Sequence, residues 1–203
     1  MNTIELNYSR RSVNFFDANR VLPDKLIKVV INEASYAPSA YNLQPFRLIQ
    51  VSSKDAKELL YNAAYKQQKI LEAPVTFIVV SNLYAFQREN PAWDESFETN
   101  GEESTLKAIQ SATKFYGKDD ISRVKFAESN SSLFAMNLMI LFKAHNVDTH
   151  PMSGMDIKKI KEGFNISKNE DVVMLISAGY FDRKQALYTR KKRKTTEMLL
   201  SKV

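Results

Sequence analysis

The stretch from Leu133 to Ala144 constrains the fold most, because all of its residues except Asn137 and Lys143 are apolar. A helix that is apolar on every side must also be covered on every side. At about 1.5 Å per residue the stretch would be near 18 Å long, which is too short to cross a bilayer. We therefore expect a long helix over residues 122–144, with its second half buried either inside one subunit or between two.

Three runs rich in β-branched and aromatic residues predict strands at residues 46–51, 75–81 and 172–180. The run 75–81 (VTFIVVS) hardly alternates between apolar and polar residues, which favours a central strand that is buried on both faces. Apolar residues at spacings of three and four predict helices. These cover residues 23–37, 54–72 with a break near Lys66, 104–116, and 156–163 with Asp156 near the N-cap.

Residues 89–93 are typical of a loop, and residues 147–155 of a turn leading into a short segment. The chain of 203 residues contains no repeat and no long linker. We therefore expect a single domain over residues 1–203, in which one sheet is flanked by helices. This pattern fits both the α/β and the α+β class.

Composition excludes several kinds of chemistry. The chain has no cysteine, which excludes disulfides, a thiolate nucleophile and a Cys-based metal site. The only histidines are His145 and His150, so we expect neither a His-rich metal centre nor a Ser-His-Asp triad. No N-terminal run resembles a signal peptide, and we expect a cytoplasmic protein without a membrane span.

Two polar stretches are the candidate binding motifs. Residues 9–16 read SRRSVNFF and place two guanidiniums beside two hydroxyls, a combination that suits a phosphate. Residues 37–46 read APSAYNLQPF and hold Ser, Asn and Gln between two prolines, so that they offer both donors and acceptors to a planar heteroaromatic ring. The alternative is that the arginines are solvated surface charges and the second stretch is an ordinary turn.

The net charge of +6 is concentrated in one run, Arg190 to Lys194. Such a run is typical of a nucleic-acid patch, a solvated tail or a phosphate clamp. Stacking aromatic residues do not alternate with these cations, and only Tyr188 is near, which argues against binding of single-stranded nucleic acid.

The order and spacing of these motifs resemble the nitroreductase family of flavin enzymes. The resemblance begins with Arg-Arg-Ser-Val and an aromatic residue, continues through the Pro-led helix and Ala-Pro-Ser-x-x-Asn-x-Gln-Pro-aromatic, and extends to the C-terminus. It implies an α+β sandwich with a central, mostly antiparallel sheet flanked by helices. It also implies one FMN-binding domain that forms a homodimer around the long apolar helix, with FMN at the interface.

The resemblance implies a set of FMN-binding residues. Arg10, Arg11 and Ser12 would bind the phosphate and the ribityl side. Asn14 lies where the family usually has a basic residue near the pyrimidine end of the ring, and its lack of charge should lower the flavin potential. Gln44 would hold the second motif in place, and its residues Ser39 and Asn42 would reach the flavin from the partner subunit.

The remaining positions come from the second half of the family pattern. Candidates for the pyrimidine edge are Lys66, Gln67 and Lys69, and one of these lysines could supply the charge missing at Asn14. In the segment PMSG, which ends at Ser153 and Gly154, a backbone N–H would face flavin N5. Lys191 and Arg193 would close on the phosphate, with Arg190, Lys192 and Lys194 pointing outward.

The implied activity is a ping-pong hydride transfer from NAD(P)H through flavin N5 to a nitroaromatic, quinone or similar acceptor, with no catalytic side chain and no metal. A family member with another acceptor, such as an enone, a haloaromatic or free flavin, remains an alternative. A basic nucleic-acid-binding protein is the rival from another class. We expect a small-molecule acceptor and no nucleic-acid or membrane partner, and we expect residues 82–117 to determine which acceptor is used.

Overall fold

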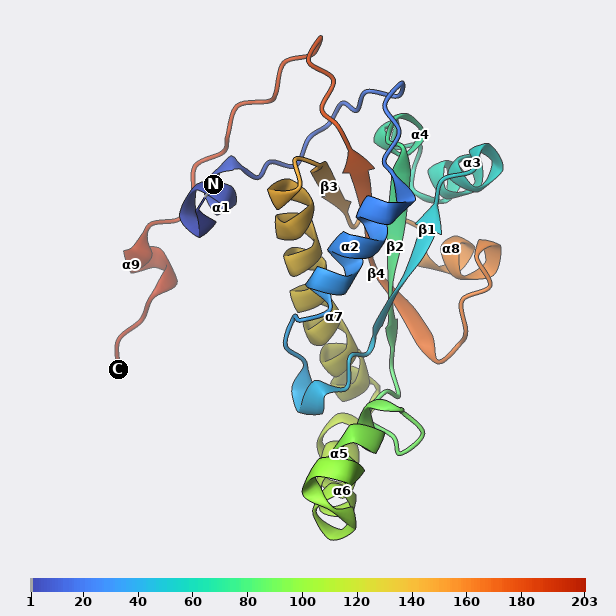
Figure 1. Ribbon diagram of the computed structural model, residues 1–203, viewed down its shortest axis with the longest axis vertical. Helices are drawn as coiled ribbons and strands as arrows, with labels where there is room; N and C mark the ends of the chain where they lie inside the picture. The colour runs from blue at the N-terminus through green and yellow to red at the C-terminus, as the bar shows by residue number, and fades with distance from the viewer. Residues whose placement is uncertain (1) are drawn as a thin grey trace.

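The computed structural model describes residues 2–203, and its centre is a four-stranded sheet with the order β1-β2-β4-β3 (Figure 1). Every neighbouring pair of strands is antiparallel. This arrangement confirms the α+β class and the antiparallel sheet. The strands are β1 (Phe46–Val51), β2 (Val75–Asn82), β3 (Asp148–Met152) and β4 (Glu170–Gly179).

Strand β2 explains why helices cover both faces of the sheet. Its side chains are buried from Val75 to Ser81, as the unbroken apolar run predicts. Phe77 and Val79 enter one core, and Ile78 and Val80 enter the other, because successive side chains of a strand point to opposite faces. The first core is closed by α2 (Asp24–Ala34) and α7 (Asp120–Ala144), and the second by α3 (Lys54–Ala63), α4 (Lys69–Glu72) and α8 (Ile157–Gly163).

Helix α7 begins where the side chain of Asp119 accepts a hydrogen bond from the backbone of Ser122. Its residues Phe134, Leu138 and Phe142 are buried in the first core. The other side of the same stretch remains open in one chain, since Leu133 is 50% and Met136 41% exposed. One chain therefore covers only part of this apolar helix.

Several helical segments lie where the sequence pattern was weak. Residues 92–100 form α5 (Ala92–Asn100), so the loop expected at residues 89–93 ends earlier, and Trp93 is a buried anchor of this helix. Next comes α6 (Glu102–Tyr116), and together the two helices form the lower end of the molecule in Figure 1. The break near Lys66 is confirmed, because Tyr65 and Lys66 both have positive φ.

Strand β3 was not predicted, since a histidine and a proline interrupt its short pattern. It is an edge strand, where a proline is tolerated. Three short elements remain. They are α1 (Thr3–Ser9) near the N-terminus, the 3₁₀ turn η1 (Ala40–Asn42) and α9 (Thr196–Leu199) near the C-terminus. Helix α1 lies beside the upper end of α7, and α9 lies farther out on the same side (Figure 1). Neither helix contains a buried residue.

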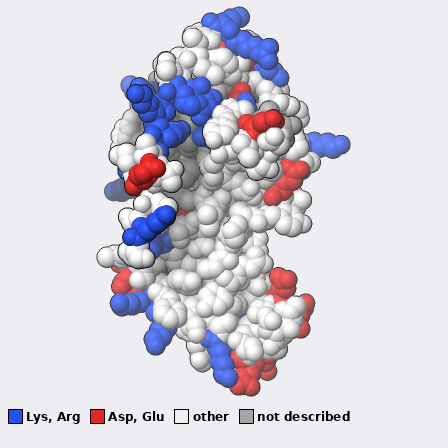
Figure 2. Space-filling view, turned by 90° about the vertical axis from the view of Figure 1, so that its left-hand side faces the viewer, with Lys and Arg blue, Asp and Glu red and all other residues white. Residues whose placement is uncertain are grey.

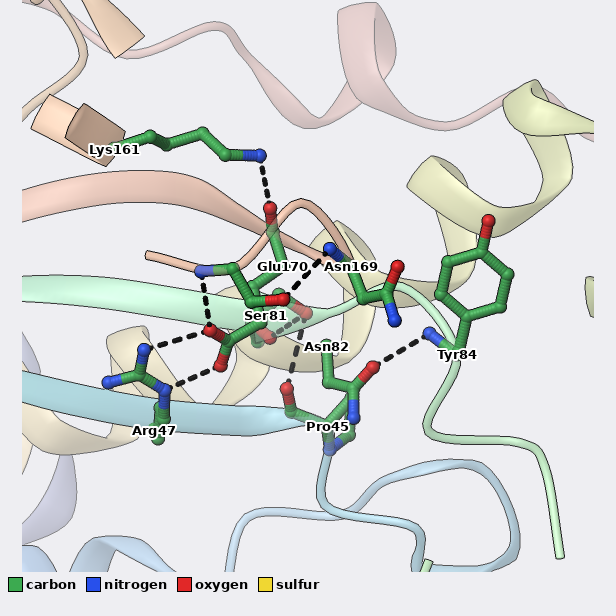
Figure 3. A network of polar contacts seen from close by, with 10 residues as sticks. Pro45, Arg47, Ser81, Asn82, Tyr84, Lys161, Asn169 and Glu170 are labelled. Atoms are coloured by element: carbon green, nitrogen blue, oxygen red, sulfur yellow. Dashed lines mark hydrogen bonds and ion pairs between the residues drawn. The ribbon is translucent and has the colours of Figure 1, made fainter. Parts of the chain in front are cut away.

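A bidentate ion pair connects β1 and β4, the two strands on either side of β2 in the sheet (Figure 3). The guanidinium of Arg47 in β1 donates to both carboxylate oxygens of Glu170 in β4, at 2.5 and 2.9 Å. This hydrogen bond is the main reason that the pKa of Glu170 is lowered. The carbonyl of Glu170 also accepts from the Lys161 ammonium, so that α8 is tied to the same point.

Among residues 2–203, no helix has the length and apolar character needed to span a membrane.

Candidate functional site

The first motif is held against the edge of the sheet by backbone contacts. Ser12 forms a parallel bridge with Thr149 of β3, and the amide of Val13 donates to the Thr149 carbonyl at 3.2 Å. His150 Nδ1 then donates to the carbonyl of Val13 at 2.7 Å. These contacts fix an extended segment from Arg10 onwards alongside β3, with its side chains pointing alternately to two sides.

Arg10 is the most unusual side chain of this segment. Its Nε and Nη1 atoms are buried and have no hydrogen-bond partner within residues 2–203. Burial lowers its pKa, and the neighbouring guanidiniums of Arg190, Arg193 and Arg11 lower it further. A buried cation without a partner costs free energy, and the surrounding positive charge adds to that cost. A phosphate dianion would supply both the missing acceptors and the missing negative charge.

The C-terminal basic run reaches Arg10 in a way that the sequence only partly predicted. Arg193 is close enough to lower the pKa of Arg10, as a phosphate clamp requires, whereas Lys191 is not among the charges that act on Arg10. Both residues are exposed. The prediction that Arg190 points outward is wrong. Its guanidinium donates to the Tyr8 carbonyl at 2.5 Å and to the Arg10 carbonyl at 3.5 Å, because the arm of residues 181–203 returns past the N-terminal segment.

Arg11 makes different contacts from Arg10, although its charge still acts on the pKa of Arg10. Arg11 donates to the carbonyl of Tyr188 and lines a different pocket, together with Val13. Ser12 is exposed. The side chain of Asn14 is half-buried and makes no hydrogen bond within the described residues 2–203.

The region before β2 meets the segment after β3. Gln67 Nε2 donates to the Gly154 carbonyl at 2.8 Å. A Cβ added to Gly154 would meet only this amide, at 3.8 Å, so that face of the backbone is open to a flat ring. Ser153 beside it is exposed. Lys66 is also exposed, in the positive-φ turn, and no hydrogen bond or ion pair within residues 2–203 ties it to this region.

Lys69 is half-buried beside His150, and burial lowers its pKa. Burial lowers the pKa of His150 as well, to about 4, with a further contribution from the Lys69 charge. His150 is therefore neutral at pH 7 and donates to the Val13 carbonyl, which gives it a structural role. Of the two lysines predicted for the pyrimidine edge, Lys69 is half-buried and Lys66 is exposed.

The second motif forms a strained loop at the other end of α7. Tyr41, Asn42 and Gln44 all have positive φ, which side chains other than glycine rarely adopt. The loop is held by Ser39 Oγ, which accepts from the Gln44 amide at 3.0 Å. Asn130 of α7 also holds it by accepting from the Ala40 amide at 2.8 Å. The Gln44 side chain adds one contact within the loop, since its Nε2 donates to the Asn42 carbonyl at 3.2 Å.

One chain does not bring the two motifs together. The second motif contacts α7 at Asn130. The start of β3, beside which the first motif lies, contacts α7 at Lys143, which pairs with Asp148 at 2.8 Å. Thirteen residues of helix correspond to roughly 20 Å. Figure 1 places η1 near the lower part of α7 and residues 10–13 beyond its upper end.

A pocket of about 360 Å³ adjoins the second motif between η1, α5 and α6. Tyr41 and Asn42 line it together with Trp93 and Ser96, and the ring centroids of Tyr41 and Trp93 are 5.5 Å apart. Neither Tyr41 nor Asn130 was predicted from the sequence to be a functional residue. The feature that distinguishes this loop is its run of residues with positive φ, and this backbone conformation is visible only in the folded structure.

The sequence matches the Nitroreductase family over residues 8–180. The Bacillus subtilis protein YodC, whose name describes it as an NAD(P)H nitroreductase, is 30% identical over 182 residues, which are 88% of this chain and 89% of YodC. The solved structure of ydfN from Bacillus subtilis, described as a nitroreductase, has a TM-score of 0.90 and 26% identity, covering 98% of both chains. An Exiguobacterium sibiricum protein solved in complex with FMN has a TM-score of 0.87 and 22% identity, covering 100% of this chain and 98% of that one.

Proposed function

This chain belongs to the nitroreductase family and is an oxidoreductase, and from that premise we propose that it uses FMN to carry hydride from NAD(P)H to a small-molecule acceptor. The observation that carries the proposal is Arg10, whose buried Nε and Nη1 lack partners within residues 2–203 although Arg190 and Arg193 stand close by. The FMN complex of the Exiguobacterium sibiricum protein, which shares the fold, supports the same cofactor.

In this proposal the chain holds the FMN phosphate with Arg10, Ser12, Lys191 and Arg193. Arg190 shapes the site through the Tyr8 and Arg10 carbonyls. Two or more guanidiniums would offset the roughly two negative charges of the phosphate. Arg11 is left out of this set because it donates to Tyr188 instead.

Lys69, Gln67, Asn14 and Gly154 would surround the ring. The half-buried ammonium of Lys69 would stabilise negative charge at the pyrimidine edge, and the Asn14 amide would donate a hydrogen bond there. Gln67 would position the Gly154 backbone through its 2.8 Å hydrogen bond. Bound FMN supplies the hydride chemistry, so no side chain needs to act as a general acid or base.

The site would be completed by a second copy of the chain. Ser39 and Asn42 lie roughly 20 Å along α7 from the level of the first motif, so they can reach the same flavin only from another subunit. The exposed side chains of Leu133 and Met136 on α7 favour the same conclusion, since a homodimer would cover them. The acceptor would then lie against the pocket of Tyr41 and Trp93 contributed by that subunit.

The first experiment is the visible spectrum of the purified protein, recorded before and after anaerobic addition of NADPH or NADH. Oxidised flavin absorbs near 370 and 450 nm, and we expect both bands to be present and to bleach. A protein that stays colourless after incubation with FMN would contradict the proposal. A panel of nitroaromatic, quinone, enone, haloaromatic and free-flavin acceptors then distinguishes the acceptor classes.

A variant and a size measurement test the geometry. Replacing Arg10 and Arg193 together with Ala should release FMN during gel filtration, and retention of full flavin would contradict the phosphate clamp. Light scattering that shows only monomer would contradict the shared site. Salt-dependent binding of DNA by a flavin-free protein would instead support the nucleic-acid alternative.

A further inference from the structure

A second basic pocket lies on the other side of the first motif. Its volume is about 400 Å³, and it is lined by residues of five separate segments. We call it the arginine pocket and define it by Arg11, Arg20, Lys143, Asp148, Tyr180 and Arg183. Arg10 does not line it, although the charge of Arg11 acts on the pKa of Arg10, as do the charges of Arg190 and Arg193.

The charges of the arginine pocket are not balanced. Asp148 is the one carboxylate among its lining residues, and both of its oxygens are already engaged. Oδ1 pairs with the ammonium of Lys143 at 2.8 Å, and Oδ2 accepts from the amide of Phe181 at 3.2 Å. Within residues 2–203 no carboxylate forms an ion pair with Arg11, Arg20 or Arg183.

Two of these three guanidiniums are held in place by other contacts. The Cζ atom of Arg20 lies 3.4 Å from the centroid of the Tyr180 ring, a cation–π contact that leaves the edge of the guanidinium free to donate. Arg11 donates to the carbonyl of Tyr188. Fixed guanidiniums bind an anion with less loss of side-chain freedom than mobile ones.

The lining also offers an apolar surface. Val13, Phe181 and Leu187 contribute to the pocket beside the ring of Tyr180. A single phosphate group would leave most of 400 Å³ unfilled, whereas this size lies in the range of small-ligand sites. Figure 2 shows Lys and Arg side chains gathered in the upper part of the face that it draws, beside a recess.

We propose that the arginine pocket is a second anion site, separate from the flavin site, which takes the phosphate groups of an adenine nucleotide. Arg20 and Arg183 bind phosphate oxygens, Arg11 adds positive charge at the inner wall, and the adenosine packs on the apolar side. The inference rests on the proposed function only in assigning the flavin phosphate to the Arg10 side. The nucleotide is either the 2′-phosphorylated half of NADPH or a free nucleotide.

Calorimetric titration of the FMN-loaded protein with adenosine 2′,5′-bisphosphate tests the site. We expect saturable binding that excess FMN does not displace. The double variant Arg20→Gln/Arg183→Gln should bind the probe at least about 10-fold more weakly, since each lost charge-assisted contact is worth about this factor or more. The control is Arg88→Gln, which removes a guanidinium beside Phe97 and Asp94 at the opposite end of the molecule.

Kinetics separates the two sources of the nucleotide. A KM for NADPH that rises at least about 10-fold in the double variant, with the KM for NADH unchanged, assigns the phosphate to the reductant. Loss of probe binding with both KM values unchanged assigns it to a free nucleotide. Either result supports the inference.

Three outcomes would overturn it. These are no binding of the probe, displacement of the probe by FMN, or loss of FMN together with the probe in the double variant. The result is distinguishable from failure of the proposed function. A colourless protein that still binds the probe through Arg20 and Arg183 would support the second site and contradict FMN binding. A flavin-containing enzyme that does not bind the probe would support FMN binding and contradict the second site.

Discussion

Arg10→Gln should weaken FMN binding and at the same time leave the cofactor-free protein no less stable. The two effects have the same origin. In the absence of a ligand, Arg10 buries a positive charge whose Nε and Nη1 have no partner within residues 2–203, beside Arg190 and Arg193. Glutamine removes that charge, and its shorter amide relieves the repulsion.

The magnitudes follow from the contacts. A hydrogen bond to a charged group is worth about 1.5–3 kcal/mol, so loss of the Arg10 contacts should cost about 3 kcal/mol of FMN binding, or roughly 150-fold in Kd. Removing an unpaired buried charge should return on the order of 1 kcal/mol to the cofactor-free protein. For a chain of this length, that corresponds to a rise in Tm of about 2–4 °C.

Fluorescence titration with FMN and thermal unfolding with and without FMN measure both effects. Wild type should be the more stable protein in excess FMN, and the variant should equal or exceed it without FMN, with Arg88→Gln serving as the matched control. If the cofactor-free variant instead unfolds several degrees earlier and its Kd for FMN is unchanged, Arg10 is a structural residue and the phosphate site lies elsewhere.

Other consequences of the structure can be measured in the same way. Asn130→Ala leaves the Ala40 amide without its acceptor, so we expect a loss of about 1–3 kcal/mol in denaturant unfolding and weaker FMN binding. Gly179→Ala would place a Cβ at 2.4 Å from Cδ of Pro74, and the backbone shift should cost about 1–3 kcal/mol in the same assay. The pKa of His150 is lowered to about 4, below its unfolded value near 6.5. The unfolded chain therefore binds more protons in this range. The free energy of unfolding should decrease as the pH is lowered from about 6.5 to 4, by an order of 1–2 kcal/mol after solvent screening. A His150→Gln variant with the same pH profile as wild type would contradict this assignment.

The sequence by itself determined the elements whose signal is local. Strand β2 is apolar at nearly every residue, and such a run is stable only between two layers, which is where it lies. The break at Lys66, the cap at Asp156 and the long helix up to Ala144 are likewise set by neighbours within a few residues. The order of the two binding motifs was also sufficient to indicate the family.

Only the tertiary structure decided which charges meet. Arg10 and Arg11 are adjacent and chemically identical, yet an extended backbone points them to opposite sides, one near Arg193 and the other to Tyr188. Strand β3 exists because β4 offers it an open edge, although its own sequence pattern is poor. Electrostatic interactions and edge pairing depend on distance in space, and for groups separated by more than 100 residues, such as Arg10 and Arg193, local sequence contains no measure of that distance.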